Sequence, residues 1–130
     1  MRGGVVRGGI AAMDLASKLQ LKSGQRLAVL GGRAGAGIDL DQFERAPDLA
    51  FADALIAIAP DRQALDSVRA DIAVAARRDV LVWVVYPKAG QLGTDLNRDF
   101  LARALADDGL RPVRQISVDG VWSALRFRTA

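Results

Sequence analysis

Residues 80–86, with the sequence Val-Leu-Val-Trp-Val-Val-Tyr, constrain the fold of this chain more than any other segment. A run of this length makes one strand, and its lack of polar alternation indicates that both faces are buried. Strands of this kind occupy the middle of parallel sheets. Pro87 ends the run, and Lys88 opens a polar loop at its carboxyl end. Ligands of open α/β sheets bind at that end of the strands.

The other segments alternate between strand-like and helix-like patterns, which predicts a single α/β domain. The predicted strands are residues 27–30 and 54–59, with 38–40 as a weak edge strand. The predicted helices are residues 14–21, 60–78 and about 96–105, with glycines after the first and third, Gly24 and Gly109. Residues 41–53 read as irregular, because Pro47 disfavours a regular helix there.

The end of the chain predicts an antiparallel hairpin. Two extended segments, 112–118 and 121–128, flank Asp119-Gly120, which is a strong signal for a two-residue turn. With that turn, one face carries Ile116, Val118, Val121, Ser123, Leu125 and Phe127. The other face carries Val113, Gln115, Trp122, Ala124 and Arg126. The whole prediction is a mostly parallel sheet with flanking helices and a C-terminal antiparallel hairpin.

Composition excludes several kinds of chemistry. The chain has no cysteine and no histidine, which rules out disulfides, thiolate nucleophiles and the commonest metal ligand and proton carrier. The formal net charge is +3, but residues 1–12 contribute two arginines and no acid. Without them 16 basic side chains face 15 acidic ones, so basicity is no argument for a nucleic-acid partner, and we expect none.

The N-terminal residues 1–12 are glycine-rich and read as a flexible tail before a domain of residues 13–130, with Met13 a candidate start. No apolar run approaches the roughly 18 residues of a membrane span. The tail also lacks the continuous apolar stretch of a secretory signal. We therefore expect a cytoplasmic protein that does not contact membranes, and the sequence identifies no partner.

The first candidate site is the polar loop that follows the central strand. Its ligand-binding candidates are Lys88, Thr94, Asp95, Asn97 and Arg98. They are predicted to gather where that strand ends and the next helix begins, and the free N–H groups and dipole there favour a small anion. In the alternative interpretation Thr94 or Asp95 only caps the helix, Arg98 pairs with an acid, and Lys88 is solvated.

Other candidate sites are weaker. The glycine turn 31–37, with Gly31 and Gly35, offers backbone amides to a phosphate but lacks the ending of a P-loop, so a plain connection is the simpler interpretation. Trp83 lies within an apolar run and reads as core. Trp122 and Arg126 are candidate interface residues, and the outer hairpin strand offers an edge through which the chain would form a homo-oligomer. No metal site has ligand spacing.

The order of these elements resembles the Rossmann-like fold of S-adenosylmethionine-dependent methyltransferases. Residues 19–31, Leu-Gln-Leu-Lys-Ser-Gly-Gln-Arg-Leu-Ala-Val-Leu-Gly, are similar to the lead-in to that family's glycine motif, acidic-x-Gly-x-Gly-x-Gly. Gly31 and Gly35 match its first and third glycines, but Val29 occupies the acidic position and Arg33 the middle glycine. An arginine side chain fills space that the backbone needs to approach a cofactor. We therefore expect no cofactor, with S-adenosylmethionine as the alternative.

Residues 15–127 also resemble a family of small bacterial proteins of unknown function. The resemblance is carried by Tyr86-Pro87-Lys88, Thr94-Asp95-Leu96-Asn97-Arg98-Asp99, Gly109-Leu110-Arg111-Pro112-Val113 and Trp122-Ser123-Ala124-Leu125-Arg126-Phe127. It implies the same reduced methyltransferase-like fold and no assigned activity. The preferred hypothesis is a non-catalytic binding or protein-interaction module. The alternative is an enzyme or small-ligand sensor that binds an anionic or nucleotide-like ligand at the carboxyl edge of the sheet.

Overall fold

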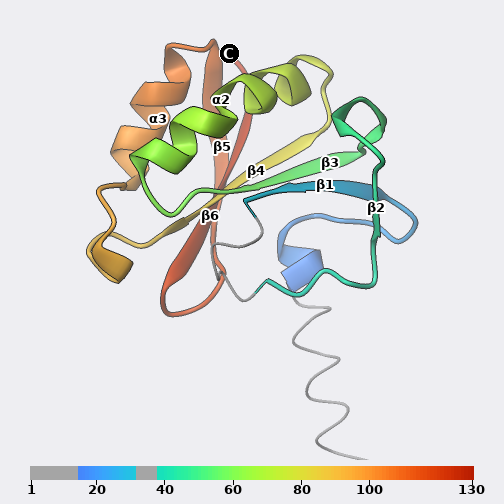
Figure 1. The fold of residues 1–130 in the computed structure, drawn as a ribbon, viewed down its shortest axis with the longest axis horizontal. Coiled ribbons are helices and arrows are strands. Elements are labelled where there is room, and N and C mark those ends of the chain that lie inside the picture. Colours follow the sequence, from blue (N-terminus) through green and yellow to red (C-terminus); the bar gives the residue numbers. More distant parts are fainter. Residues whose placement is uncertain (1–14, 32–37) are drawn as a thin grey trace, which may run out of the picture.

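A computed structural model describes residues 15–31 and 38–130. One six-stranded sheet, in the order β2-β1-β3-β4-β6-β5, runs through the molecule (Figure 1). Its strands are β1 (Arg26–Leu30), β2 (Glu44–Arg45), β3 (Ala54–Ile58), β4 (Leu81–Pro87), β5 (Leu110–Ser117) and β6 (Trp122–Thr129). The helices are α2 (Arg62–Arg77) and α3 (Arg98–Ala106), with short 3₁₀ turns η2 (Leu49–Phe51) and η3 (Gln91–Gly93). The mixed α/β fold predicted from the sequence is confirmed.

The parallel half of the sheet follows from its apolar runs. β2, β1, β3 and β4 pair in parallel, and β6 joins β4 in the antiparallel sense. Every residue of β3 is buried, and in β4 only the first is not, as expected for central strands. The carboxyl ends of β1, β3 and β4 therefore lie at one edge of the sheet.

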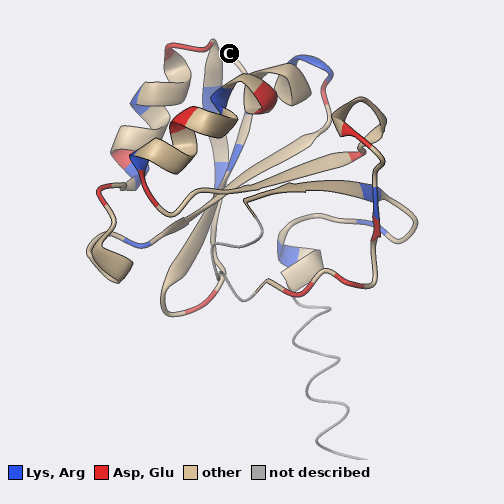
Figure 2. Cartoon of the chain, viewed as in Figure 1, with Lys and Arg blue, Asp and Glu red and all other residues tan. Residues whose placement is uncertain are grey.

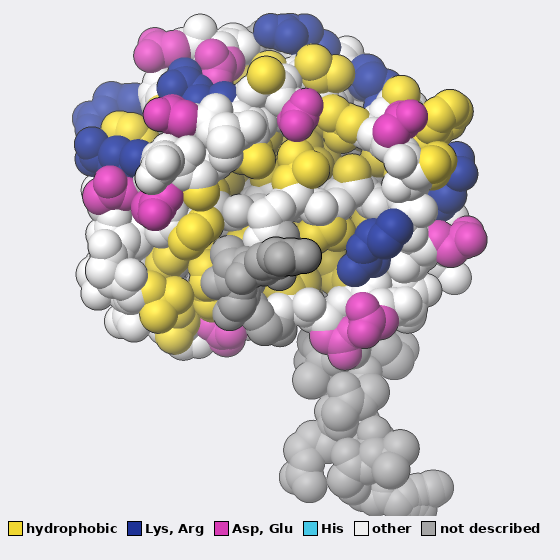
Figure 3. Space-filling view, viewed as in Figure 1, with side chains coloured by type: hydrophobic (Ala, Val, Ile, Leu, Met, Phe, Trp, Pro, Cys, Tyr) yellow, Lys and Arg dark blue, Asp and Glu magenta, His cyan; other side chains and the backbone are white. Residues whose placement is uncertain are grey.

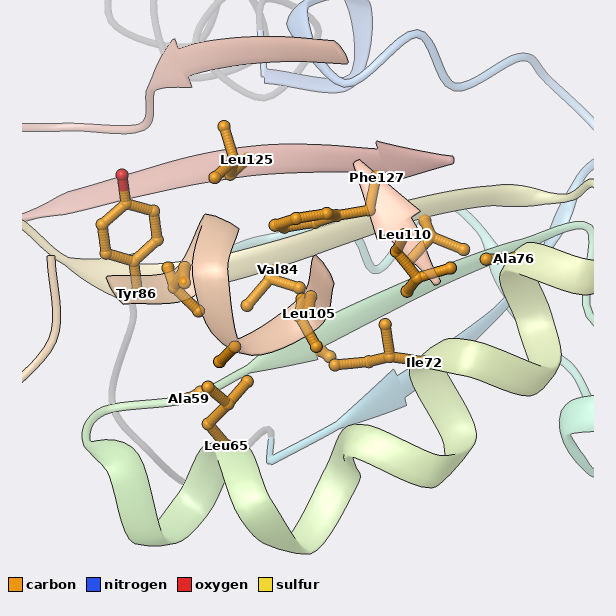
Figure 4. Packing of buried hydrophobic residues seen from close by; sticks show 14 of the residues in the cluster. Ala59, Leu65, Ile72, Ala76, Val84, Tyr86, Leu105, Leu110, Leu125 and Phe127 are labelled. Carbon is orange, nitrogen blue, oxygen red and sulfur yellow. The ribbon is translucent and has the colours of Figure 1, made fainter. Parts of the chain in front are cut away.

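Both long helices cover the same face of the sheet. Asp61 begins α2 by accepting a hydrogen bond from the backbone N–H of Ala64 at 2.8 Å. The buried residues of this layer are drawn from α2, α3 and the strands beneath them; Leu65, Ile72, Leu105, Val84 and Phe127 are examples (Figure 4). This layer carries the larger of the two apolar cores.

The opposite face is covered by short segments. Residues 15–18 form one helical turn, and Ala16, Leu19, Leu40 and Phe43 pack on this face against strand residues that include Trp83. The indole N–H of Trp83 donates to the carbonyl oxygen of Leu19 at 2.8 Å. Trp83 is fully buried, so its prediction as a core residue is confirmed.

Two details of the strand assignment were wrong. Residues 38–40 are not a strand; the edge strand is β2, inside the segment that read as irregular, which also contains η2. Leu40 is 1% exposed and anchors its segment in the core instead. The apolar residues Ile38 and Leu40 therefore indicated burial here and not strand pairing. No helix among the described residues has the length and hydropathy needed to cross a membrane.

The hairpin exists, but its predicted turn was wrong. Ser117 pairs with Ser123 and Ile116 with Ala124, which is one residue away from the register of a two-residue turn at Asp119-Gly120. The Asp119 carboxylate accepts hydrogen bonds from the N–H groups of Val121 and Trp122, both at 2.8 Å, and so widens the loop. A shift of one residue exchanges the faces of a strand. Gln115 and Ser117 consequently share a face with Ser123 and Leu125, while Ile116 and Val118 lie with Trp122 and Ala124.

Candidate anion-binding site

A pocket of about 550 Å³ opens at the carboxyl end of β4, on the face that the two helices cover. Its walls come from β4, the loop that follows it, the first residue of α3 and the two hairpin strands. The lining residues are Tyr86, Lys88, Ala89, Arg98, Gln115, Ile116, Ser117 and Ser123. Two cationic side chains and several hydroxyl groups therefore surround one space, and no acidic side chain of the described residues lines it.

Lys88 is fixed to the hairpin by its backbone and its side chain. Its N–H donates to the carbonyl oxygen of Val121 at 2.7 Å, which continues the pairing of β4 with the loop before β6. Its ammonium group donates to the Ser117 hydroxyl oxygen at 2.9 Å. The Ser117 hydroxyl in turn donates to the carbonyl oxygen of Asp119 at 3.2 Å. The ammonium group is thereby held at the rim of the pocket, with donor capacity left for a ligand.

Tyr86 forms the inner wall. Its residue surface is 2% exposed, and its ring lies at the end of the apolar cluster with the hydroxyl pointing away from Ala59 and Leu65 (Figure 4). Ser123, which lies opposite it on β6, is 4% exposed. The Gln115 amide donates to the Tyr86 hydroxyl oxygen at 3.5 Å, a long contact. The polar end of a buried aromatic side chain thus meets the pocket.

Burial raises the pKa of the Tyr86 phenol above its usual value. A hydrogen bond with Ser123 and the positive charge of Arg98 lower the pKa by smaller amounts. The phenol is therefore neutral at neutral pH and has an O–H group with which it can donate a hydrogen bond. A neutral donor beside two cations suits an anion, because it adds a hydrogen bond without adding negative charge.

The start of α3 adds to the positive field. Asn97 begins this nine-residue helix, and its side-chain oxygen accepts a hydrogen bond from the N–H of Phe100 at 2.8 Å. Arg98 is the first residue of the helix. Its side chain is 49% exposed and lies 3.7 Å from the carboxylate of Asp99, which is itself 82% exposed. An exposed pair at this distance is weak, so the guanidinium group remains available to a ligand.

Two of the predicted ligand residues have other partners. The Thr94 hydroxyl donates to the carbonyl oxygen of Pro60 at 2.8 Å and accepts from the N–H of Leu96 at 3.1 Å. The Asp95 carboxylate accepts from the N–H of Arg62 at 2.9 Å. These bonds join the loop to the start of α2. The alternative interpretation, in which Thr94 or Asp95 caps α3, was wrong, because Asn97 is the cap.

The neighbouring strand β3 leaves no room for a side chain at position 31. Gly31 follows β1 with φ at +73°, and a Cβ atom there would overlap the carbonyl oxygen of Ile58 at the end of β3. Its small size is therefore used for packing β1 against β3. Gly35, the other predicted glycine, lies outside the described residues.

The two candidate interface residues lie on the far side of the hairpin from the pocket. Trp122 is 3% exposed and packs in the core against Ala124 and the covering N-terminal segment. Arg126 is half-buried, and its Nη1 donates to the side chain of Gln20 at 2.8 Å. Burial, followed by the positive charge of Arg128, lowers the pKa of Arg126; the charge of Asp79 opposes this, and that of Arg114 adds a still smaller lowering.

Sequence reasoning missed the four other polar residues of the pocket: Tyr86, Gln115, Ser117 and Ser123. Tyr86 was visible as the polar end of the central strand. The others reach the pocket only through the hairpin register, which the turn signal predicted incorrectly. Among the described residues, no three Asp or Glu side chains are close enough together to hold a metal ion.

This arrangement of strands and helices is a methyltransferase-like fold. Among solved structures, the mitomycin 7-O-methyltransferase MmcR is similar, with a TM-score of 0.56 at 17% identity, over 93% of this chain and 53% of that one. LepI in complex with SAM has a TM-score of 0.52 at 17% identity, over 94% of this chain and 40% of LepI. The chain thus spans about half or less of the length of these structures. No protein-family model and no curated protein matches the sequence.

Proposed function

We propose that this protein is a non-catalytic, methyltransferase-like binding module that holds a small anionic ligand between β4, the hairpin and the start of α3. The observation that carries the proposal is the lining of the pocket. Among the described residues that line it, Lys88 and Arg98 supply the charges, and Tyr86 and Ser123 supply buried hydroxyl groups. Phosphate, phosphate ester and carboxylate groups are the ligands that such a set of donors recognises.

Two observations support the non-catalytic part of the proposal: the composition of the chain, and the residues at the carboxyl end of β1. No histidine or cysteine is present to transfer protons or attack a substrate. Val29 stands where the methyltransferase motif has an acid, and the packing of Gly31 against Ile58 accounts for that glycine without a cofactor. The proposal also includes the cytoplasmic place of action that is expected from the sequence.

Thermal unfolding of the full chain with inorganic pyrophosphate, inorganic phosphate and S-adenosylmethionine tests the proposal. Pyrophosphate is expected to raise the midpoint by several degrees, since a ligand at 100 times its dissociation constant adds about 2.7 kcal/mol. S-adenosylmethionine is expected to have no effect. The double variant Lys88→Gln/Arg98→Gln should lose the response to pyrophosphate.

The matched control is Arg77→Gln/Arg103→Gln. It removes the same charge from exposed positions in the last turns of α2 and α3. This control should respond to pyrophosphate as the unmodified protein does. An equal response in both double variants, or none in the unmodified protein, would exclude the pocket as an anion site. Stabilisation by S-adenosylmethionine followed by methyl transfer would show that the protein is an enzyme.

A further inference from the structure

Four arginines form an array on the C-terminal hairpin, away from the pocket. Arg111 and Arg114 belong to β5, and Arg126 and Arg128 belong to β6. Arg111 lies directly opposite Arg128, and Arg114 directly opposite Arg126. Opposite residues are about 5 Å apart and residues two apart on a strand about 7 Å, so the array is small. Figure 2 shows blue bands on β5 and β6 close to the C-terminal end.

A β-bulge brings the four side chains to one face. Arg111 and Arg114 are three residues apart, which would place them on opposite faces of a regular strand. The register shifts between Pro112 and Arg114, so Val113 is an extra residue and both arginines point the same way. Arg126 lies opposite Trp83 of β4, which places the array on the face that α2 and α3 do not cover.

The array is poorly neutralised within the protein. Arg128 contacts the exposed carboxylate of Asp79 at 3.3 Å, and Arg126 contacts the neutral Gln20. Arg111 and Arg114 are exposed and make no side-chain hydrogen bond or ion pair with any described residue. On the face shown in Figure 3, by contrast, positive and negative side chains are interspersed.

Like charges directly opposite each other destabilise a sheet. Two such pairs side by side, completed by a bulge, therefore lower the stability of the sheet instead of adding to it. All four are arginines, whose planar guanidinium groups match phosphate oxygens in pairs, whereas lysine offers only a point charge. A partner that carries regularly spaced phosphates would remove the repulsion within the array.

We propose that the array Arg111, Arg114, Arg126 and Arg128 binds the phosphate backbone of a double-stranded nucleic acid without reading its sequence. The two aromatic residues of the hairpin, Trp122 and Phe127, are 3% and 0% exposed. The hairpin thus offers no aromatic surface on which unpaired bases would stack, which favours a duplex over a single strand. The nearly neutral net charge of the domain is compatible with this, because an electrostatic footprint depends on where charges lie.

The test is binding of the full chain to a fluorescent 20-base-pair DNA duplex of random sequence, measured by anisotropy at several salt concentrations. The double variant Arg111→Gln/Arg114→Gln should bind about tenfold more weakly or worse near 0.1 M salt. Its salt dependence, as the slope of log affinity against log salt concentration, should fall by about 1.8, because each lost phosphate contact removes about 0.9.

Arg77→Gln/Arg103→Gln, with the same total charge, should bind within about twofold of the unmodified protein. Equal losses in the two double variants would mean that total charge and not the array determines binding, and would overturn the proposal. Tighter binding to a single strand of thymidines, to polyglutamate or to anionic vesicles than to the duplex would also overturn it. The pyrophosphate response of the pocket should be unchanged in Arg111→Gln/Arg114→Gln, so the two proposals fail separately.

Discussion

Replacing Gly31 by alanine tests why the first glycine of the methyltransferase-like motif is present in this chain. The φ angle of +73° alone costs a residue with a side chain about 1–2 kcal/mol. In addition, the new Cβ atom would overlap the carbonyl oxygen of Ile58, so the backbone of β1 or β3 must move. Forced displacement of packed atoms costs about 1–3 kcal/mol more. The expected loss in free energy of unfolding is therefore about 2–5 kcal/mol.

Gly24 provides the matched control. It has a similar φ angle of +88°, but nothing lies within 4 Å of the position that a Cβ atom would take. Gly24→Ala should therefore lose only the conformational part, about 1–2 kcal/mol. The difference between the two variants isolates the contact with β3.

Urea unfolding followed by tryptophan fluorescence measures both losses, provided that the dependence on urea concentration stays the same. Gly31→Ala should also melt on the order of 10 °C below the unmodified protein. Equal losses in the two variants, within about 0.5 kcal/mol, would refute the close contact between Gly31 and Ile58. Gly31 would then be free to serve a ligand.

Two further predictions concern the pocket. Tyr86 is the only tyrosine, so the ultraviolet absorbance of tyrosinate reports it alone, and its midpoint should lie above 10.0. Because the pKa of Tyr86 is raised in the folded state, the contribution of the protonated phenol to stability is complete below pH 10 and is lost as the pH rises further. Arg98→Gln removes a positive charge that lowers this pKa, so the midpoint should rise further in that variant. An unchanged midpoint would show that the charge of Arg98 does not act on the phenol. Asn97→Ala should lower the free energy of unfolding by about 1 kcal/mol through loss of the α3 cap, whereas Asn97→Asp, which keeps the acceptor, should not; urea unfolding distinguishes them.

The parallel core was predictable because its signals are local. Residues 80–86 and 54–59 are continuous apolar runs, and each became a central strand with almost no exposed surface. Asp61 and Gly109 lie at helix ends where their side chain or positive φ angle is used. Such features depend on a few neighbouring residues, so the sequence alone is sufficient to read them.

The outer hairpin strand, β5, has features against edge pairing that the sequence pattern of a strand did not reveal. It was expected to offer an edge for self-association, and β5 is the outermost strand on its side of the sheet. However, it carries Pro112, the bulge at Val113 and the exposed Arg111 and Arg114. Proline, bulges and charges are the features by which natural proteins block edge pairing. Self-association through β5 is thus disfavoured by the strand itself.

The candidate site was only partly predictable, because it depends on pairing between distant segments. Lys88 and Arg98 were found from their place after the central strand, and both line the pocket. Thr94 and Asp95 lie between them in sequence, yet they bond to the start of α2. Nearness along the chain therefore identified the loop but not which of its side chains face the pocket.

Asp119 links the fold to both proposed sites although it lines neither of them. Its carboxylate accepts two backbone N–H groups and so sets the register of β5 against β6 one residue from that of a two-residue turn. In this register Gln115 and Ser117 face the pocket beside Ser123. The bulge at Val113 then lets Arg111 join Arg114 on the opposite face. One side-chain acceptor in the turn and one extra residue in the strand thus separate the proposed anion site from the arginine array on the two faces of a single hairpin.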